Sequence, residues 1–249
     1  MNEHNHFYSS ISKYYSEIFP YKPVQLKFVR ENLFELPGKR ILDIGCATGE
    51  LAFQLAMSGA SVVGIDLNKD LLKQTNQKSK HSSLTFQPGN MLELKADFEF
   101  GEFDAVLCFG NTLVHLESLE LVKRMLEEAK YVLKPGGNLF IQILNYDYIL
   151  NDHVTELPII ETDKIKFIRK YKFPENSSVI QFITHLEIKQ ENKTVSNTTF
   201  LLALGSYELR HLLKDVGFGN IHFYSNFNQE AFGGKHLPLV LKCKKQEMR

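Results

Sequence analysis

The chain has 249 residues, of which 43% are hydrophobic, and this is enough to bury the core of one large domain. Its 29 basic and 29 acidic residues leave a formal charge of zero, which argues against nucleic acid as the main partner, because nucleic-acid binders usually carry a basic surplus. The polar N-terminus lacks the apolar core of a signal peptide, and no apolar run approaches a membrane span, so we expect a cytoplasmic protein with no membrane partner.

The first 36 residues carry two groups of aromatic and apolar side chains ahead of any strand pattern. The second group, from Val24 to Phe34, recurs with helical spacing behind Pro23, a residue that suits the first turn of a helix. We therefore predict two helices before the first strand. Tyr14 and Tyr15 are adjacent, so one of them can face a ligand site while the other packs on the core.

The stretch from Arg40 to Asp66 predicts a strand, a glycine-rich turn, a helix and a second strand. A short apolar run ends at Ile44, as is typical of a strand that is buried on both faces. Gly45 to Gly49 form the turn, in which missing side chains let a ligand approach the backbone. Apolar residues then recur at helical spacing until Gly59, which is placed as a C-terminal cap, and the second strand ends at Asp66.

Asp66 stands at the tip of the second strand, 23 residues after Asp43, which leaves room for one helical crossover. A carboxylate at this place can accept two hydrogen bonds from the vicinal hydroxyls of a ribose. The dinucleotide pattern G-x-G-x-x-G is not met, because Cys46, Ala47 and Thr48 separate the two glycines. The stretch therefore predicts a nucleoside cradle on a parallel sheet that is not a dinucleotide site.

Alternating helices and strands are expected to continue from residue 68 to residue 144. Asn68 can cap a helix that runs to about Lys80, and strands are expected at residues 84–87, 103–109 and 138–144. A helix from about Ser118 to Leu133 is expected to stop at a Leu-Lys-Pro-Gly-Gly turn. The segment that leaves the carboxyl end of a central strand lines the ligand crevice of an open α/β sheet, so polar residues after residue 109 are candidate site residues.

The pattern changes between Glu161 and Leu204, where apolar residues alternate with polar ones in three segments joined by turn sequences. Period-two segments of this kind predict antiparallel hairpins, and such an insertion commonly covers a crevice and carries specificity. Ser206 is expected to cap a last helix that stops at Gly217. Two closing strands, at residues 220–225 and 237–243, are expected to form an antiparallel hairpin.

Cys46, Cys108 and Cys243 lie far apart in apolar surroundings. No pair has metal-ligand spacing, and an odd number does not fit a disulfide framework, so we expect free buried thiols and no metal site.

The sequence Asp43-Ile-Gly-Cys-Ala-Thr-Gly49 resembles motif I of the class I S-adenosylmethionine-dependent methyltransferases, whose usual form is acid-x-Gly-x-Gly-x-Gly. Ala47 replaces the middle glycine, and we expect this to be harmless only if the residue keeps a negative φ. The resemblance implies an α/β fold with a Rossmann-like, seven-stranded, mostly parallel sheet, helices on both faces and an antiparallel β insertion. It also implies a single domain over residues 1–249: lid helices at 1–37, a core at 38–152 and 205–245, and the insertion at 153–204.

The resemblance implies S-adenosyl-L-methionine as the cofactor and S-adenosyl-L-homocysteine as its product. The turn backbone would face the amino-acid end of the cofactor, Asp66 its ribose, and Asn90 the adenine amino group, between the side chains of Leu67 and Met91. The residues that the resemblance places at the cofactor are Tyr14, Asp43, Gly45, Cys46, Ala47, Thr48, Gly49, Asp66, Leu67, Asn90, Met91 and Phe109.

Two segments, Cys108 to His115 and Asn145 to Leu150, look like parts of glycine and sarcosine N-methyltransferases that touch the cofactor and the amine. They imply that Asn111, His115, Asn145 and Tyr146 bind the acceptor. In those enzymes an arginine before Asn-Tyr-Asp grips the substrate carboxylate, and Leu144 stands there in this chain. Without a guanidinium the bidentate grip is lost, so the reaction class carries over but glycine does not.

We expect methyl transfer to a nitrogen or oxygen of a small molecule, by in-line displacement at a sulfonium. A base is needed only where the acceptor must lose a proton, and His115 is the candidate for it, with a structural hydrogen bond as the alternative role. Two other functions stay open: an RNA or protein methyltransferase, which a basic groove would favour, and a binding protein that holds the cofactor without turnover. The oligomeric state is not readable from the sequence.

Overall fold

The structure is a computed structural model that describes residues 3–75 and 81–246. Within these residues a seven-stranded sheet has the order β10-β11-β5-β4-β1-β2-β3. Its strands are β1 (Arg40–Ile44), β2 (Ser61–Asp66), β3 (Leu84–Pro88), β4 (Phe103–Cys108), β5 (Leu133–Leu144), β10 (Phe218–Tyr224) and β11 (Pro238–Lys245). The neighbours from β5 to β3 are parallel, and β11 is antiparallel to both β5 and β10. The predicted fold class is confirmed, including the closing hairpin.

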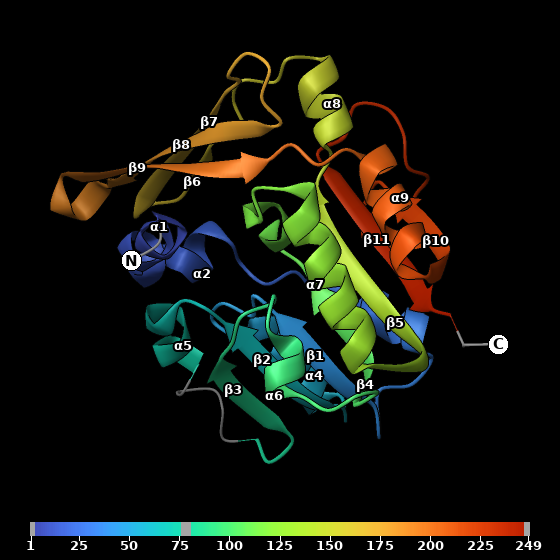
Figure 1. Ribbon diagram of the computed structural model, residues 1–249. Coiled ribbons are helices and arrows are strands. Elements are labelled where there is room, and N and C mark those ends of the chain that lie inside the picture. Colours follow the sequence, from blue (N-terminus) through green and yellow to red (C-terminus); the bar gives the residue numbers. More distant parts are fainter. Residues whose placement is uncertain (1–2, 76–80, 247–249) are drawn as a thin grey trace.

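Helices cover both faces of this sheet (Figure 1). On one face, α3 (Pro23–Leu33) and α4 (Glu50–Met57) pack on alternate strand residues such as Ile41. On the other face lie α6 (Leu94–Asp97), α7 (Leu119–Val132) and α9 (Ser206–Val216), which pack on residues such as Leu42. Because Ile41 and Leu42 are both fully buried but on opposite faces, β1 is the doubly buried strand that its apolar run predicts.

A second, antiparallel sheet of the described residues has the order β6-β7-β8-β9, and we call it the roof sheet. Its strands are β6 (Ile160–Glu161), β7 (Ile165–Lys172), β8 (Val179–Ile188) and β9 (Lys193–Leu202), with the short 3-10 helix η3 (Lys189–Glu191) between the last two. Helix α8 (Tyr146–Asn151) leads into it from β5. The predicted antiparallel insertion is therefore confirmed, with β6 as an additional short strand.

The N-terminal segment lies between the two sheets (Figure 1). It consists of α1 (Glu3–Ile11), the 3-10 turn η1 (Ser12–Tyr14) and α2 (Tyr15–Ile18), and it precedes α3. Phe7, Ile11 and Ile18 are buried in the same hydrophobic cluster as the inner side of the roof sheet. Helices do precede the first strand, as predicted, and Pro23 is the first residue of α3.

Three local expectations were wrong or fall partly outside the described residues. The expected turn at 133–137 is instead part of β5, because buried Leu133 already pairs with Phe103, and a bulge follows before Asn138 pairs with Ala105. Ser206 does not cap α9: Gly205 holds that position, and the Ser206 N–H donates to Asp147. Helix α5 (Lys69–Thr75) is described only to Thr75, so its expected end near Lys80 lies outside the described residues.

Candidate functional site

The turn between β1 and α4 is fastened to the end of β2 by backbone hydrogen bonds. The N–H groups of Gly45 and Cys46 donate to the carbonyl of Ile65 at 2.8 and 3.0 Å. The N–H of Ala47 donates to Oδ2 of Asp66 at 2.9 Å, and the N–H of Asn68 donates to Oδ1 of the same carboxylate at 2.8 Å. The acid that the sequence places at the tip of the second strand therefore holds the shape of the turn.

The glycines of the turn are required by packing inside the protein. Gly45 and Gly49 have φ values of 69° and 75°, which L side chains rarely adopt. A Cβ at Gly45 would lie 2.7 Å from the side chain of Thr112, and one at Gly49 would lie 2.4 Å from the ring of Phe86. Protein side chains therefore occupy the space that a Cβ would take at these two positions.

The backbone conformation of Ala47 differs from the expected one. Its φ is 49°, in the left-handed region, whereas a negative φ was the condition for a harmless replacement of glycine. A non-glycine residue pays roughly 1–2 kcal/mol for this conformation. The hydrogen bond from Ala47 to Asp66 offsets part of this strain.

Two carboxylates lie together at this edge of the sheet. Asp43 is buried at the end of β1, and burial, followed by the charge of Asp66, raises its pKa to about 7. Desolvation also raises the pKa of Asp66, although its backbone hydrogen bonds act in the opposite direction. No lysine or arginine of the described residues is among the groups that shift either pKa. The pair is therefore a site of desolvated carboxyl groups without a basic counter-ion among the described residues.

The residues expected at an adenine ring lie beside this pair. Leu67 follows Asp66 and is 57% exposed, which is unusual for a large apolar side chain next to a sheet edge. Met91 is buried, and Oδ1 of Asn90 accepts the Leu92 N–H at 3.0 Å. Asn90 thus shapes its own turn, and its amide group and the second lone pair of Oδ1 remain for a ligand.

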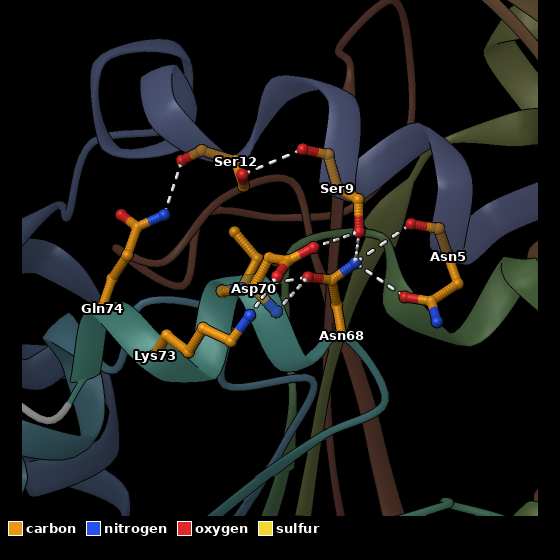
Figure 2. A network of polar contacts seen from close by, with 8 residues as sticks. Asn5, Ser9, Ser12, Asn68, Asp70, Lys73 and Gln74 are labelled. Carbon is orange, nitrogen blue, oxygen red and sulfur yellow. Dashed lines mark hydrogen bonds and ion pairs between the residues drawn. The ribbon is translucent and has the colours of Figure 1, made fainter.

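The N-terminal segment is fastened across this site by a polar network (Figure 2). Asn68 caps α5, as predicted, by accepting the N–H groups of Asp70 and Leu71 at its Oδ1. Its Nδ2 donates to the carbonyl and the side chain of Asn5 and to the hydroxyl of Ser9. One side chain therefore joins the start of α5 to α1, and further bonds run from Ser9 to Asp70 and from Gln74 to Ser12.

Tyr15, and not Tyr14, is the lid residue that approaches the carboxylates. Tyr14 donates instead to Glu191 at the tip of the roof sheet at 3.0 Å, so its expected place at the cofactor differs from its place in the structure. Burial raises the pKa of Tyr15 well above its usual value, with further contributions from Tyr8 and Asp66. Adjacent side chains point apart here, as the sequence predicts, but the assignment of the two tyrosines is reversed.

Thr48, Cys46 and Phe109, three further residues expected at the cofactor, are buried. The hydroxyl of Thr48 lies 3.2 Å from that of Ser16, which adds a second link between the N-terminal segment and the turn. Burial raises the pKa of the Cys46 thiol well above its usual value, and all three cysteines are free and buried, as expected. Phe109 packs against Phe28 and Phe227, so its side chain contributes to the core.

Two of the four residues expected at the acceptor are hydrogen-bonded to each other, and a third, His115, contacts Tyr8. Nδ2 of Asn111 donates to the hydroxyl of Tyr146 at 3.3 Å, and burial raises the pKa of Tyr146 to about 12. Nε2 of His115 lies 2.8 Å from the hydroxyl of Tyr8 on α1. Burial, followed by the charges of Asp66 and Tyr146, raises the pKa of Tyr8, so Tyr8 lies near both of these groups.

Asn145, the fourth expected acceptor residue, has a structural role. It is buried, its Oδ1 accepts the N–H of Tyr148 at the start of α8, and its Nδ2 donates to the carbonyl of His236. Both ends of its amide are therefore used within the fold.

The sequence reasoning missed three polar residues on the inner face of the roof sheet. Nε of Arg169 and the hydroxyls of Tyr171 and Thr184 are buried without a hydrogen-bond partner among the described residues. The signal for Arg169 was available, because it is a charged residue at an apolar position of the period-two pattern.

Comparisons with known proteins agree with this geometry. Residues 41–137 match the family model described as a methyltransferase domain. A ubiquinone biosynthesis O-methyltransferase of Methylococcus capsulatus is 33% identical over 124 residues, which are 49% of this chain and 50% of that protein. The chain spans about half the length of the curated relatives that it matches.

Solved structures show the same fold. A S-adenosylmethionine-dependent methyltransferase from Clostridium acetobutylicum has a TM-score of 0.80 at 15% identity, over 97% of this chain and 100% of that one. The sugar N-methyltransferase KedS8 from a Streptoalloteichus species has a TM-score of 0.67 at 17% identity, over 90% of this chain and 87% of that one.

The seven-stranded sheet, its turn after β1 and the acid after β2 define a Rossmann-like methyltransferase fold. Residues 41–137 match a methyltransferase domain, in agreement with the resemblance of the sequence to class I S-adenosylmethionine-dependent methyltransferases, and the fold is the one that such enzymes have. The local resemblance to glycine and sarcosine N-methyltransferases is not confirmed. No helix in the described part of the chain is both long enough and apolar enough to cross a membrane.

Proposed function

We propose that this chain is a S-adenosylmethionine-dependent methyltransferase that transfers a methyl group to a nitrogen or oxygen atom of a small molecule. The family match over residues 41–137 supports the reaction class. The names of relatives support the acceptor class, since one acts in ubiquinone biosynthesis as an O-methyltransferase and another is a sugar N-methyltransferase.

The observation that carries the proposal is the pair of carboxylates, Asp43 and Asp66. Both pKa values are raised by desolvation, and no basic side chain of the described residues offsets either charge. Buried anions of this kind are costly unless a cation compensates them. The sulfonium and ammonium groups of S-adenosylmethionine are cations, so the cofactor would supply the charge that the protein lacks here.

The remaining residues of the cradle fit the other parts of the cofactor. Each oxygen of Asp66 accepts one backbone N–H and keeps a lone pair, so both can also accept a ribose hydroxyl. Exposed Leu67 offers an apolar surface for one face of the adenine ring, and Asn90 offers its free amide group to the ring edge. The turn from Gly45 to Gly49 would hold the amino-acid end.

When bound, the cofactor supplies a methyl group on a positively charged sulfur, and the sulfur leaves as a neutral thioether. The protein therefore needs no acid, and its main task is to hold the acceptor atom in line with the methyl carbon and the sulfur. Asn111, Tyr146 and Tyr8 form the polar wall on which the acceptor would be oriented. His115 is the candidate to take a proton from an acceptor that must lose one.

Calorimetric titration with S-adenosylhomocysteine, with NAD as the control ligand, tests this proposal. We expect micromolar binding of the first ligand and none of the second, because the turn lacks the dinucleotide pattern. Folded protein that does not bind S-adenosylhomocysteine would overturn the assignment.

A further inference from the structure

We propose that the inner face of the roof sheet carries an anion-binding subsite, built around Arg169, that takes a carboxylate or phosphate group of the methyl acceptor. This inference rests on the proposed function, because it assigns the acceptor that such an enzyme would use.

The strand register places Arg169 on the inner face. Arg169 lies directly across from Thr184, which lies across from Asn197 on the next strand. Thr184 is 1% exposed, and Nδ2 of Asn197 donates to the hydroxyl of Ser10 on α1. The three residues form one polar row across β7, β8 and β9, on the side that faces the N-terminal segment.

The residues around this row are apolar and confirm its orientation. Phe167, two residues before Arg169, packs its ring edge-on against Phe19, with the ring centroids 6.0 Å apart. Phe182, two residues before Thr184, packs in the same way against Phe7 at 6.1 Å. Arg169 itself lies over the ring of Phe167 at 5.9 Å. Its guanidinium is therefore on the inner side of the sheet, beside the ring of Phe167.

The polar atoms of this group are incompletely satisfied. Nη2 of Arg169 donates to the carbonyl of Pro158 at 2.7 Å, but its Nε has no partner among the described residues. The hydroxyl of Thr184 is also without a partner there. Tyr171 lies close enough to Tyr146 for each to affect the pKa of the other, yet its hydroxyl makes no hydrogen bond of acceptable geometry in the described part of the chain. Three unsatisfied donors on neighbouring strands are unusual in a stable fold and indicate a ligand.

The positive charge of Arg169 indicates that the ligand is an anion. Arg169 has no carboxylate within ion-pair distance among the described residues, and burial lowers its pKa. A partly desolvated guanidinium without a counter-ion is costly, and its planar donors match a carboxylate or phosphate. The hydroxyls of Thr184 and Tyr171 would add two further donors to the same anion.

The anion subsite lies next to the residues that are proposed to orient the methyl acceptor. Tyr171 neighbours Tyr146, whose hydroxyl accepts from Asn111, and Tyr8 connects this wall to Asp66. An acceptor held at its anionic end by Arg169 would therefore point its other end toward the residues proposed to orient the methyl acceptor. This is the arrangement that a short molecule with an anion and a nucleophile needs.

Anion binding to the protein loaded with S-adenosylhomocysteine tests the subsite. Thermal unfolding is followed during titration with sodium acetate or sodium phosphate, against sodium chloride at equal ionic strength. We expect acetate, phosphate or both to stabilise the parent above chloride, and the more effective anion identifies the group. Arg169→Gln should raise the concentration for half of the effect roughly 10- to 100-fold, as expected for lost charge-assisted hydrogen bonds.

The matched control is Lys172→Gln, which removes an exposed charge from the outer face of the same strand and should leave the anion response unchanged. Thr184→Val and Tyr171→Phe keep the charge but remove one hydroxyl each, so they should weaken the response severalfold. They also test the subsite if Arg169→Gln fails to fold.

An acceptor assay tests the substrate class directly. An amino acid and its carboxamide offer the same amine with and without the anion, and we expect the parent to prefer the acid and Arg169→Gln to lose that preference. Equal responses of the parent and Arg169→Gln to the anions, with S-adenosylhomocysteine bound by both, would overturn the subsite and leave the proposed function standing. Failure of the parent to bind S-adenosylhomocysteine would overturn the proposed function itself.

Discussion

The backbone N–H of Ala47 donates to Oδ2 of Asp66 at 2.9 Å, and Ala47 has a left-handed φ of 49°. The turn residue that the motif would make glycine is therefore held in a glycine-like conformation by the acid at the end of the next strand. One hydrogen bond therefore links the backbone strain at Ala47 to the position of the Asp66 carboxylate.

Ala47→Gly should stabilise the protein by roughly 0.5–1 kcal/mol. The substitution relieves the left-handed strain, and the larger entropy of the unfolded glycine chain cancels part of this gain. Chemical denaturation measures the change. The matched control, Ala52→Gly in the first turn of α4, should destabilise by about 1 kcal/mol, because that residue is helical and buried. A destabilised Ala47→Gly variant would show that the alanine is not strained.

Asp66→Ala should weaken S-adenosylhomocysteine binding roughly 10- to 100-fold, since it removes the acceptor of the ribose hydroxyls and releases Ala47 and Asn68. Calorimetry on variants that give the parent's circular dichroism spectrum measures this loss. Asp215→Ala, at an exposed position on α9, is the control and should bind like the parent. Parent-like binding by Asp66→Ala would remove this residue from the ribose site.

Asp43 should make the ligand-free protein less stable as pH rises from about 4 to 7. Its pKa is raised to about 7, so the folded state holds a proton there that the unfolded state has already lost, and stability falls through this window. The effect is at most about 4 kcal/mol. Asp43→Asn should flatten the melting temperature between pH 5 and pH 8, whereas Asp215→Asn should not. An unchanged slope in Asp43→Asn would place the titration elsewhere.

Asn68→Asp should loosen the N-terminal segment without unwinding α5. An aspartate keeps the oxygen that caps α5 but loses the Nδ2 that donates to Asn5 and Ser9. Amide hydrogen exchange should therefore increase in residues 5–12 and stay low in α5. In Asn68→Ala both regions should exchange faster, with a loss of about 1 kcal/mol from the missing cap. Equal protection of residues 5–12 in Asn68→Asp and the parent would contradict the role of this network.

The sequence predicts the core of the fold because its signals are local. The apolar run before Gly45, the glycine spacing and the acid at Asp66 specify a strand, a turn and a crossover within 27 residues. The alternation in residues 165–188 specifies the roof sheet in the same way, and both predictions were confirmed.

The site was harder to predict, because side-chain direction depends on distant contacts. Tyr14 turns to Glu191, 177 residues away, while Tyr15 takes the inner position. The side-chain amide of Asn145 bonds to the start of α8 and to the carbonyl of His236. The ring of Phe109 packs against aromatic rings from two other segments. The alternating pattern identifies Arg169 only as one residue of a strand, and its unsatisfied Nε depends on the neighbouring strands.

The roof sheet is one continuous stretch of chain, which leaves the core after β5 and returns to it before α9. The turn and the acids that would hold the cofactor all come from segments outside this stretch. Substitutions of roof-sheet residues that do not contact the N-terminal segment can therefore accumulate without disturbing the cradle. In evolutionary terms, a lineage with this architecture can exchange one acceptor for another while its methyl-donor chemistry is inherited intact.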